Sequence, residues 1–169
     1  TFLICCCSVL SFILHTWIRF GLNVFSERGD GFHNIESIFQ TVDLYDELMV
    51  SEIADNRCVV ECDTFKLPEK NTLTNSYEAF CQVSMVKVPG VKVVLKKMIP
   101  SGGGLGGGSA DAAALVRALQ KICGIKLSAS QLNQIAEKTG SDVFFFMNCF
   151  FLLKILLPFS YIQQSCICF

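Results

Sequence analysis

The chain has 169 residues, which is the usual size of one domain and enough to bury a sizeable core. Its 14 basic and 15 acidic residues give a formal net charge of −1, which argues against a protein that binds nucleic acid by neutralising phosphates. Hydrophobic residues make up 51% of the chain and charged residues 17%, which excludes an intrinsically disordered protein.

The two ends of the chain differ in composition from its middle. Residues 1–18 contain no Asp, Glu, Lys or Arg, and after Asp142 the sole charged residue is Lys154. A membrane anchor is not expected in the first run, because His15 and Thr16 interrupt it and no basic segment precedes it as in a signal peptide. The ten cysteines have no spacing typical of a zinc site, so we expect reduced thiols, with neither metal nor disulfides.

The middle of the chain predicts strands first. Residues 34–42 and 44–53 interleave apolar and polar side chains, which indicates a β-hairpin that turns near residues 43–46. Residues 57–63 predict a third strand and residues 91–99 a fourth.

Three helices are indicated between and after these strands. Asn71 is a suitable N-cap for the first, whose apolar residues recur at helical spacing up to Cys81. A second helix is predicted over residues 109–123, with Gly124 to end it. Residues 128–131 form a capping box for a third helix, which Gly140 closes. Strands followed by helices in one unit favour the α+β class.

A glycine-rich loop lies between the last of these strands and the second helix. Six of the 12 glycines fall between Pro100 and Ser109. Glycine lets a backbone approach an anion closely, and the start of the following helix offers free N–H groups and the positive end of its dipole. The loop therefore predicts a phosphate-binding site.

Two common phosphate-binding classes do not fit this loop. In the Walker pattern a Lys follows the last glycine, but here that residue is Ser109. Gly102, Gly104 and Gly107 satisfy the G-x-G-x-x-G pattern, but a second helix follows where a dinucleotide-binding fold needs a strand that ends in an acidic residue.

Three segments together resemble the GHMP small-molecule kinases. Residues 100–110 are similar to the family signature P-x-x-x-G-L-G-[GS]-[GS]-S-[AS]. Residues 28–33, RGDGFH, resemble the R-x-D-G-[FY]-H element of one branch of the family, and residues 140–143, GSDV, resemble its G-[SA]-D-[VIT]-P-F-F element. The order and spacing agree from Arg28 to Phe146.

The resemblance implies a fold and a division of the chain. We expect the α+β N-terminal domain of a GHMP kinase, which is similar to domain 2 of ribosomal protein S5, without the family's C-terminal domain. This ATP-binding domain would span residues 26–146. Residues 1–25 would be an atypical apolar segment that partly replaces the first strand, and residues 147–169 an atypical apolar tail.

The resemblance also implies an activity. That branch of the family uses ATP, with Mg²⁺ on the nucleotide, to phosphorylate a hydroxyl of a cytidine diphosphate sugar alcohol in non-mevalonate isoprenoid synthesis. By this resemblance Asp142 is the base that accepts the hydroxyl proton, Phe32 stacks on the cytosine ring and His33 hydrogen-bonds to it. The residues that would bind ATP are Pro100, Gly102, Gly103, Gly104, Leu105, Gly106, Gly107, Gly108 and Ser109. We expect no nucleic-acid or membrane partner, and a bacterial cytoplasm, with a plastid as second choice.

Several positions depart from the family pattern. Trp17 stands where the first strand of the family has a Lys that serves the transferred phosphate, and Arg19 stands where it has Asn. We therefore expect the chain as written to be inactive, a fragment or damaged copy whose two ends are not native coding sequence. The alternative is a membrane-tethered module that binds nucleotides or anions without catalysis. We also expect a side chain at Gly106 or Gly107 to weaken ATP binding and leave the fold largely intact.

Overall fold

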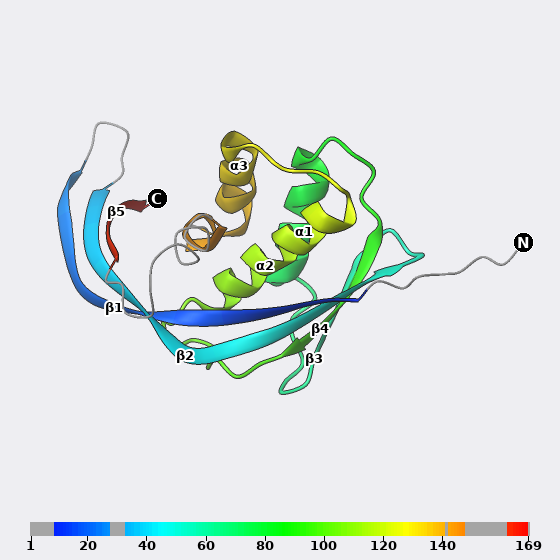
Figure 1. The fold of residues 1–169 in the computed structure, drawn as a ribbon, viewed down its shortest axis with the longest axis horizontal. Helices are drawn as coiled ribbons and strands as arrows, with labels where there is room; N and C mark the ends of the chain where they lie inside the picture. The colour runs from blue at the N-terminus through cyan, green and yellow to red at the C-terminus, as the bar shows by residue number, and fades with distance from the viewer. Residues whose placement is uncertain (1–8, 28–32, 141, 148–161, 169) are drawn as a thin grey trace, which may run out of the picture.

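The computed structural model describes residues 9–27, 33–140, 142–147 and 162–168, with only some of the side chains within residues 10–53 and the backbone alone for residues 162–168. The expected α+β class is confirmed: a curved sheet carries helices on one face (Figure 1).

The sheet is built around one long strand. Strand β1 (Leu10–Glu27) pairs antiparallel with β2 (His33–Ile53), and the second half of β2 pairs antiparallel with β4 (Gly90–Lys96). Strand β3 (Cys58–Cys62) pairs parallel with β4, which gives the order β1-β2-β4-β3. Strand β5 (Ile162–Cys168) pairs with the first half of β2, at the end of the sheet far from β4.

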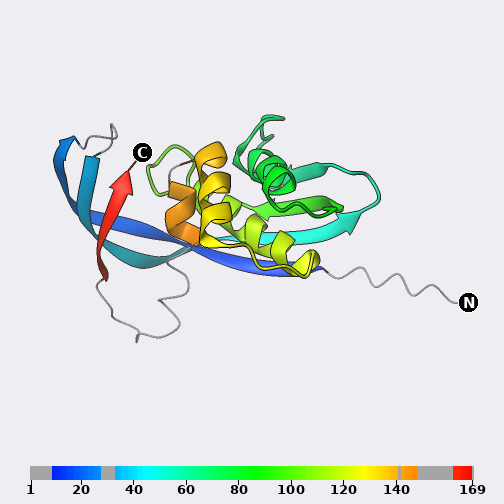
Figure 2. The same ribbon diagram turned by 90° about the horizontal axis from the view of Figure 1, so that it is seen from above.

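Three helices lie on one side of the sheet. They are α1 (Thr72–Val83), α2 (Gly107–Ile122) and α3 (Ala129–Thr139), and both ribbon views place them on the same side (Figures 1 and 2). Helix α2 contacts β1 and β2, α1 contacts β3 and α2, and α3 packs against α1. In β4 every second residue is buried, and α2 buries apolar residues at helical spacing, so the two patterns meet in one core. Its fully buried large side chains include Leu48, Val50, Phe80, Val91, Val93, Leu95, Leu115 and Leu119.

The predicted hairpin within residues 34–53 is wrong. The backbone continues as the single strand β2 through the region where the turn was expected. Of the two acidic residues at the ends of the expected turn, Asp43 is exposed on the continuous strand, and Asp46 is fully buried in an ionic contact with Lys97, so the polarity of Asp46 marks an interior partner and not a solvent-exposed bend. The fourth strand also ends earlier than predicted, at Lys96. The backbone N–H groups of Met98 and Ile99 donate to Asp46 Oδ1 and not to a neighbouring strand.

The helix signals are confirmed. Asn71 caps α1 with a capping box, and Ser128 caps α3 in the same way through Gln131. Helix α2 begins at Gly107, two residues before the predicted start, and Gly124 follows its end with φ +64°. A short helical segment covers residues 142–147.

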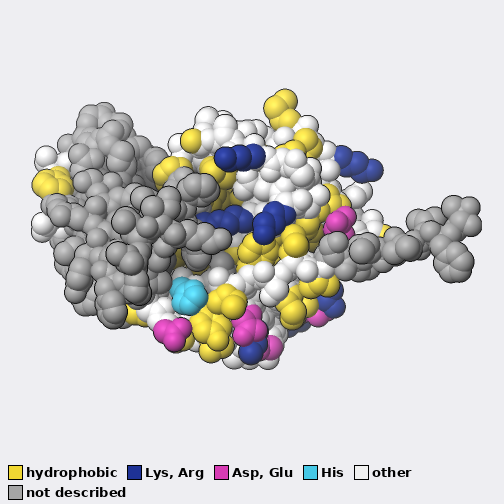
Figure 3. All heavy atoms as spheres, viewed as in Figure 1, with side chains coloured by type: hydrophobic (Ala, Val, Ile, Leu, Met, Phe, Trp, Pro, Cys, Tyr) yellow, Lys and Arg dark blue, Asp and Glu magenta, His cyan; other side chains and the backbone are white. Residues whose placement is uncertain are grey.

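None of the helices in the described ranges combines the length and the apolar character needed to cross a bilayer. Within the apolar run of residues 1–18, which raised the possibility of a membrane anchor, residues 10–18 belong to β1. On the face shown in Figure 3, hydrophobic side chains lie among charged ones.

Candidate functional site

The glycine-rich loop leads directly into α2, as predicted. Gly102, Gly104 and Gly106 have φ values of +81°, +68° and +68°, in the left-handed region that glycine adopts without strain. Gly106 is the N-cap residue, and because it has no side chain, it offers no side-chain acceptor to the first N–H groups of α2. These groups and the helix dipole favour an anion at this position.

The loop forms one wall of a cavity of about 410 Å³. The opposite wall comes from the segment before α1 and from the first turn of that helix: Phe65, Leu67, Pro68, Lys70, Asn71, Thr72 and Leu73. The starts of the two helices are close, since a Cβ added to Gly108 would lie 3.3 Å from Thr72 Oγ1. Two helix N-termini therefore approach the same cavity, and one of them, that of α2, lacks a side-chain cap.

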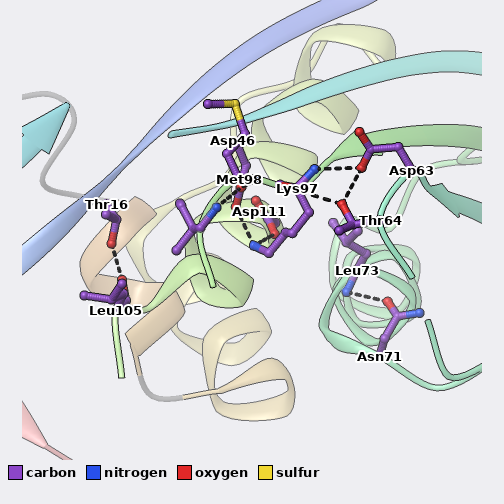
Figure 4. A network of polar contacts seen from close by, with 11 residues as sticks. Thr16, Asp46, Asp63, Thr64, Asn71, Leu73, Lys97, Met98, Leu105 and Asp111 are labelled. Carbon is purple, nitrogen blue, oxygen red and sulfur yellow. Dashed lines mark hydrogen bonds and ion pairs between the residues drawn. The ribbon is translucent and has the colours of Figure 1, made fainter. Parts of the chain in front are cut away.

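A buried ionic cluster lies against this cavity (Figure 4). Lys97 Nζ donates to Asp46 Oδ2 and, at 2.8 Å, to Asp111 Oδ2, and all three side chains are at most 8% exposed. Asp46 lies in β2, Lys97 follows β4 and Asp111 lies in α2. The cluster therefore fixes the chain on both sides of the glycine loop, before it at residue 97 and after it at residue 111.

The two carboxylates of this cluster share one ammonium group. Burial raises the pKa of Asp111 to about 7, against the opposing effect of Lys97, and its Oδ1 has no hydrogen-bond partner among the described residues. Burial acts to lower the pKa of Lys97, but Asp111 and Asp46 outweigh it and the pKa is raised. Lys97 is therefore charged at neutral pH.

Lys97 also lies directly against the first turn of α2. A Cβ added to Gly107 would lie 2.9 Å from Lys97 Nζ and 2.8 Å from Ile99 Cγ2. The helix start can thus approach the ammonium group only because residue 107 has no side chain. A Cβ added to Gly106 would lie 2.9 Å from the ring of Phe146. Our expectation that side chains at Gly106 or Gly107 leave the fold largely intact is therefore at odds with the packing.

Asp142 is exposed, although a wholly apolar run of residues follows it in the sequence. It begins the helical segment 142–147, one turn before Phe146, and residues one turn apart lie on the same side of a helix. Phe146 packs against Gly106 at the end of the glycine loop, and Arg117 of α2 donates to the carbonyl oxygen of Phe146 at 2.5 Å. The segment that carries Asp142 is thus held beside the loop.

The other predicted residues are described only in part. Phe32 lies outside the described residues. His33 is described by its backbone alone, as the first residue of β2, at the opposite end of that strand from β4. Trp17 and Arg19 pair through their backbones with Thr41 and Phe39, and their side chains are not described.

Sequence reasoning missed the groups around the loop. The sequence indicates Lys97 only as part of the strand over residues 91–99, Asp111 only as part of a helix and Asn71 only as a cap, although all three line the cavity. Lys97 and Asp111 acquire their positions through partners more distant in sequence: the two contact each other across 14 residues, and Asp46 lies 51 residues before Lys97. A charged residue within an apolar helical face, as Asp111 is among alanines, was the one available signal.

Several known proteins resemble this chain in sequence. Residues 71–149 match the family described as GHMP kinases N terminal domain. The chain is 46% identical over 139 residues to 4-diphosphocytidyl-2-C-methyl-D-erythritol kinase of Treponema pallidum strain Nichols, covering 82% of this chain and 47% of that protein. It is 39% identical over 133 residues to the kinase of the same name from Fusobacterium nucleatum, covering 77% of this chain and 45% of that protein.

Solved structures of kinases also resemble this chain. A crystal structure of 4-(cytidine 5'-diphospho)-2C-methyl-D-erythritol kinase matches with a TM-score of 0.67 and 28% identity, covering 82% of this chain and 48% of that one. Galactokinase of Lactococcus lactis matches with a TM-score of 0.56 at 15% identity over 80% of this chain and 38% of that one, which shows a shared fold alone. The chain spans about half the length of the curated relatives it matches.

Proposed function

Because the chain carries the N-terminal domain of the GHMP kinases, we propose that its glycine-rich loop binds the phosphates of ATP. The observation that carries the proposal is the meeting of this loop with the uncapped start of α2 at the wall of a cavity. The residues proposed to hold ATP are Pro100, Gly102, Gly103, Gly104, Leu105, Gly106, Gly107, Gly108 and Ser109. Pro100 and Ser109 bound this loop, and both line the cavity.

The composition of the cavity suits a nucleotide. The loop side offers backbone N–H groups for phosphates, and the side before α1 offers apolar surface from Phe65 and Leu67, on which a base can pack.

We propose that Mg²⁺ arrives with the nucleotide. Among the described residues no three His, Cys, Asp or Glu side chains are grouped as a metal site.

The proposed reaction is that of the relatives at their full length. It is the transfer of the γ-phosphoryl group of ATP to the 2-hydroxyl of 4-diphosphocytidyl-2-C-methyl-D-erythritol, a step in isoprenoid precursor synthesis. Asp142 is proposed as the base, which its location beside the end of the loop supports. Phosphoryl transfer needs positioned phosphates, charge stabilisation and one acceptor for the hydroxyl proton. Phe32 and His33 are proposed to recognise the cytosine ring.

A charge change in the loop tests ATP binding. Gly104 has φ +68°, which Asn and Asp tolerate, and a Cβ added there meets nothing within 4 Å. Gly104→Asn and Gly104→Asp therefore differ in charge at nearly equal shape. We expect Gly104→Asp to bind ATP at least about 10-fold more weakly than Gly104→Asn in calorimetric titrations, because a carboxylate repels the phosphates.

Adenosine serves as the control ligand, since its affinity should not depend on the charge at residue 104. Equal ATP affinity for the two variants, or no ATP binding by the unsubstituted chain, would refute the proposal.

The role of Asp142 is tested by the substitution Asp142→Asn in a full-length, repaired enzyme. The substitution should leave ATP affinity unchanged and abolish phosphorylation, because an amide cannot accept the proton.

A further inference from the structure

One buried hydroxyl connects β1 to the glycine-rich loop. Thr16 is completely buried within an otherwise largely apolar part of β1, and its Oγ1 donates to the carbonyl oxygen of Leu105 (Figure 4). A buried hydroxyl without a partner is costly, so this hydrogen bond strongly favours one orientation of the loop backbone. The two residues are 89 positions apart in the chain.

The orientation of this carbonyl determines where the next N–H points. In a trans peptide unit the C=O of one residue and the N–H of the next point in opposite directions. With the Leu105 carbonyl directed at Thr16, the N–H of Gly106 is directed away from β1. Leu105 and Gly106 both line the cavity, and Gly106 is the N-cap of α2.

Without this contact the peptide unit would have more freedom. Rotation of this unit changes the ψ angle of Leu105 and the φ angle of Gly106, and glycine, here with φ +68°, moves between backbone conformations at little cost. The ionic cluster holds the chain at residues 97 and 111, outside the loop, whereas Thr16 contacts the loop itself.

We propose that Thr16 is a positioning residue of the anion site: its hydroxyl fixes the Leu105–Gly106 peptide so that the Gly106 N–H is available to a phosphate. The inference rests on the proposed function, because it assigns that phosphate to the glycine-rich loop. Thr16 itself does not touch the ligand.

The test compares Thr16→Val, which removes the hydroxyl at nearly equal shape, with Thr16→Ser, which retains it. The ligands are ATP, inorganic tripolyphosphate and adenosine, titrated calorimetrically into the full chain. Thr16→Val should bind ATP and tripolyphosphate about 3- to 10-fold more weakly, as expected for one hydrogen bond. Thr16→Ser should stay within about 2-fold of the unsubstituted chain, and adenosine affinity should be the same in all three proteins.

A second measurement does not need a substituted protein. In the ¹⁵N spectrum of the unsubstituted chain, the amide of Gly106 should be among the signals that tripolyphosphate shifts most. Equal weakening of adenosine and ATP by Thr16→Val would show a general structural role and overturn the inference, as would unchanged affinities or an unshifted Gly106 amide. Binding of tripolyphosphate without ATP would refute the proposed function and leave the inference on Thr16 standing. Binding of neither would refute both.

Discussion

The glycines of the loop are not equivalent. Gly106 and Gly107 are packed against Phe146, Ile99 and Lys97, whereas Gly103 could carry a Cβ with ordinary contacts of 3.7 Å. Close packing of the backbone, and not only phosphate binding, therefore requires glycine at the end of the loop.

We predict that Gly106→Ala lowers the free energy of unfolding by about 1–3 kcal/mol, because the alanine would occupy a left-handed conformation and press on Phe146. Gly103→Ala, whose backbone is not left-handed, should change it by less than about 0.5 kcal/mol. Urea denaturation of both variants measures the difference. Equal stabilities would mean that the ring of Phe146 moves aside and that the positive φ costs nothing.

Asp111 provides a prediction about pH. Its folded pKa of about 7 lies above the ordinary value of 3.8, so the folded state holds a proton that the unfolded state has released between these pH values. Stability from this group is therefore greatest below pH 4 and is lost as the pH rises towards 7. Asp111→Asn, which stays neutral, should become progressively more stable relative to the unsubstituted chain from pH 4 to 7. A difference that is independent of pH in chemical denaturation would contradict the shift.

Local signals define the helices. The side chain of Asn71 accepts from the N–H groups of Leu73 and Thr74, and the hydroxyl of Thr74 accepts from the N–H of Asn71 in return. Such reciprocal caps depend on residues three positions apart, so the sequence alone reveals them. The starts of α1 and α3 were predicted accurately from their caps for this reason, whereas the start of α2, which has no side-chain cap from Gly106, was predicted two residues late.

We predict that Asn71→Ala lowers the free energy of unfolding by about 1 kcal/mol, because two N–H groups at the start of α1 lose their acceptor. Ser128→Ala is the matched control in α3, where the same kind of cap lies away from the cavity, and it should cost a similar amount. Only Asn71→Ala should also alter ATP affinity. Denaturation measures the loss of stability in both variants, and ATP titration measures the change in affinity. An equal effect of the two substitutions on ATP affinity would show that Asn71 has no specific role in ATP binding.

At the scale of the whole molecule, the ionic cluster beside the glycine-rich loop connects β2, the segment after β4 and α2. Asp46 Oδ1 accepts from the N–H groups of Met98 and Ile99 at 2.7 and 2.8 Å, while its Oδ2 accepts from Lys97. One side chain of β2 thus bends the chain out of β4 and also orients the lysine that contacts α2.

We predict that Asp46→Ala lowers the free energy of unfolding by about 3 kcal/mol or more, because two backbone N–H groups and an ammonium group lose their acceptor. Asp46→Asn, whose amide oxygen can still accept from Met98 and Ile99, should lose less. The thermal midpoint and urea denaturation measure both effects. Equal losses would show that the ionic contact with Lys97, and not the backbone hydrogen bonds, is the dominant interaction.

The local sequence determined much of this protein. Capping boxes, the apolar spacing of α2 and the glycines before it predicted the helices, the α+β class and a loop at a helix start, because each depends on residues within about one or two helical turns. Motifs at residues 28–33, 100–110 and 140–143 gave the family, which the match of residues 71–149 supports. The assignments of Phe32, His33 and Asp142 stay predictions.

Only the tertiary structure decided the role of the isolated polar residues. Asp46 was interpreted as part of a turn, and Thr16 as an interruption of an apolar segment, because a polar residue in a single sequence has the same pattern whether it faces solvent or a distant partner. Their partners, Lys97 and Leu105, lie 51 and 89 residues away. A buried polar group must be satisfied, but which partner satisfies it depends on how β1, β2 and α2 pack together, and no local pattern contains that information.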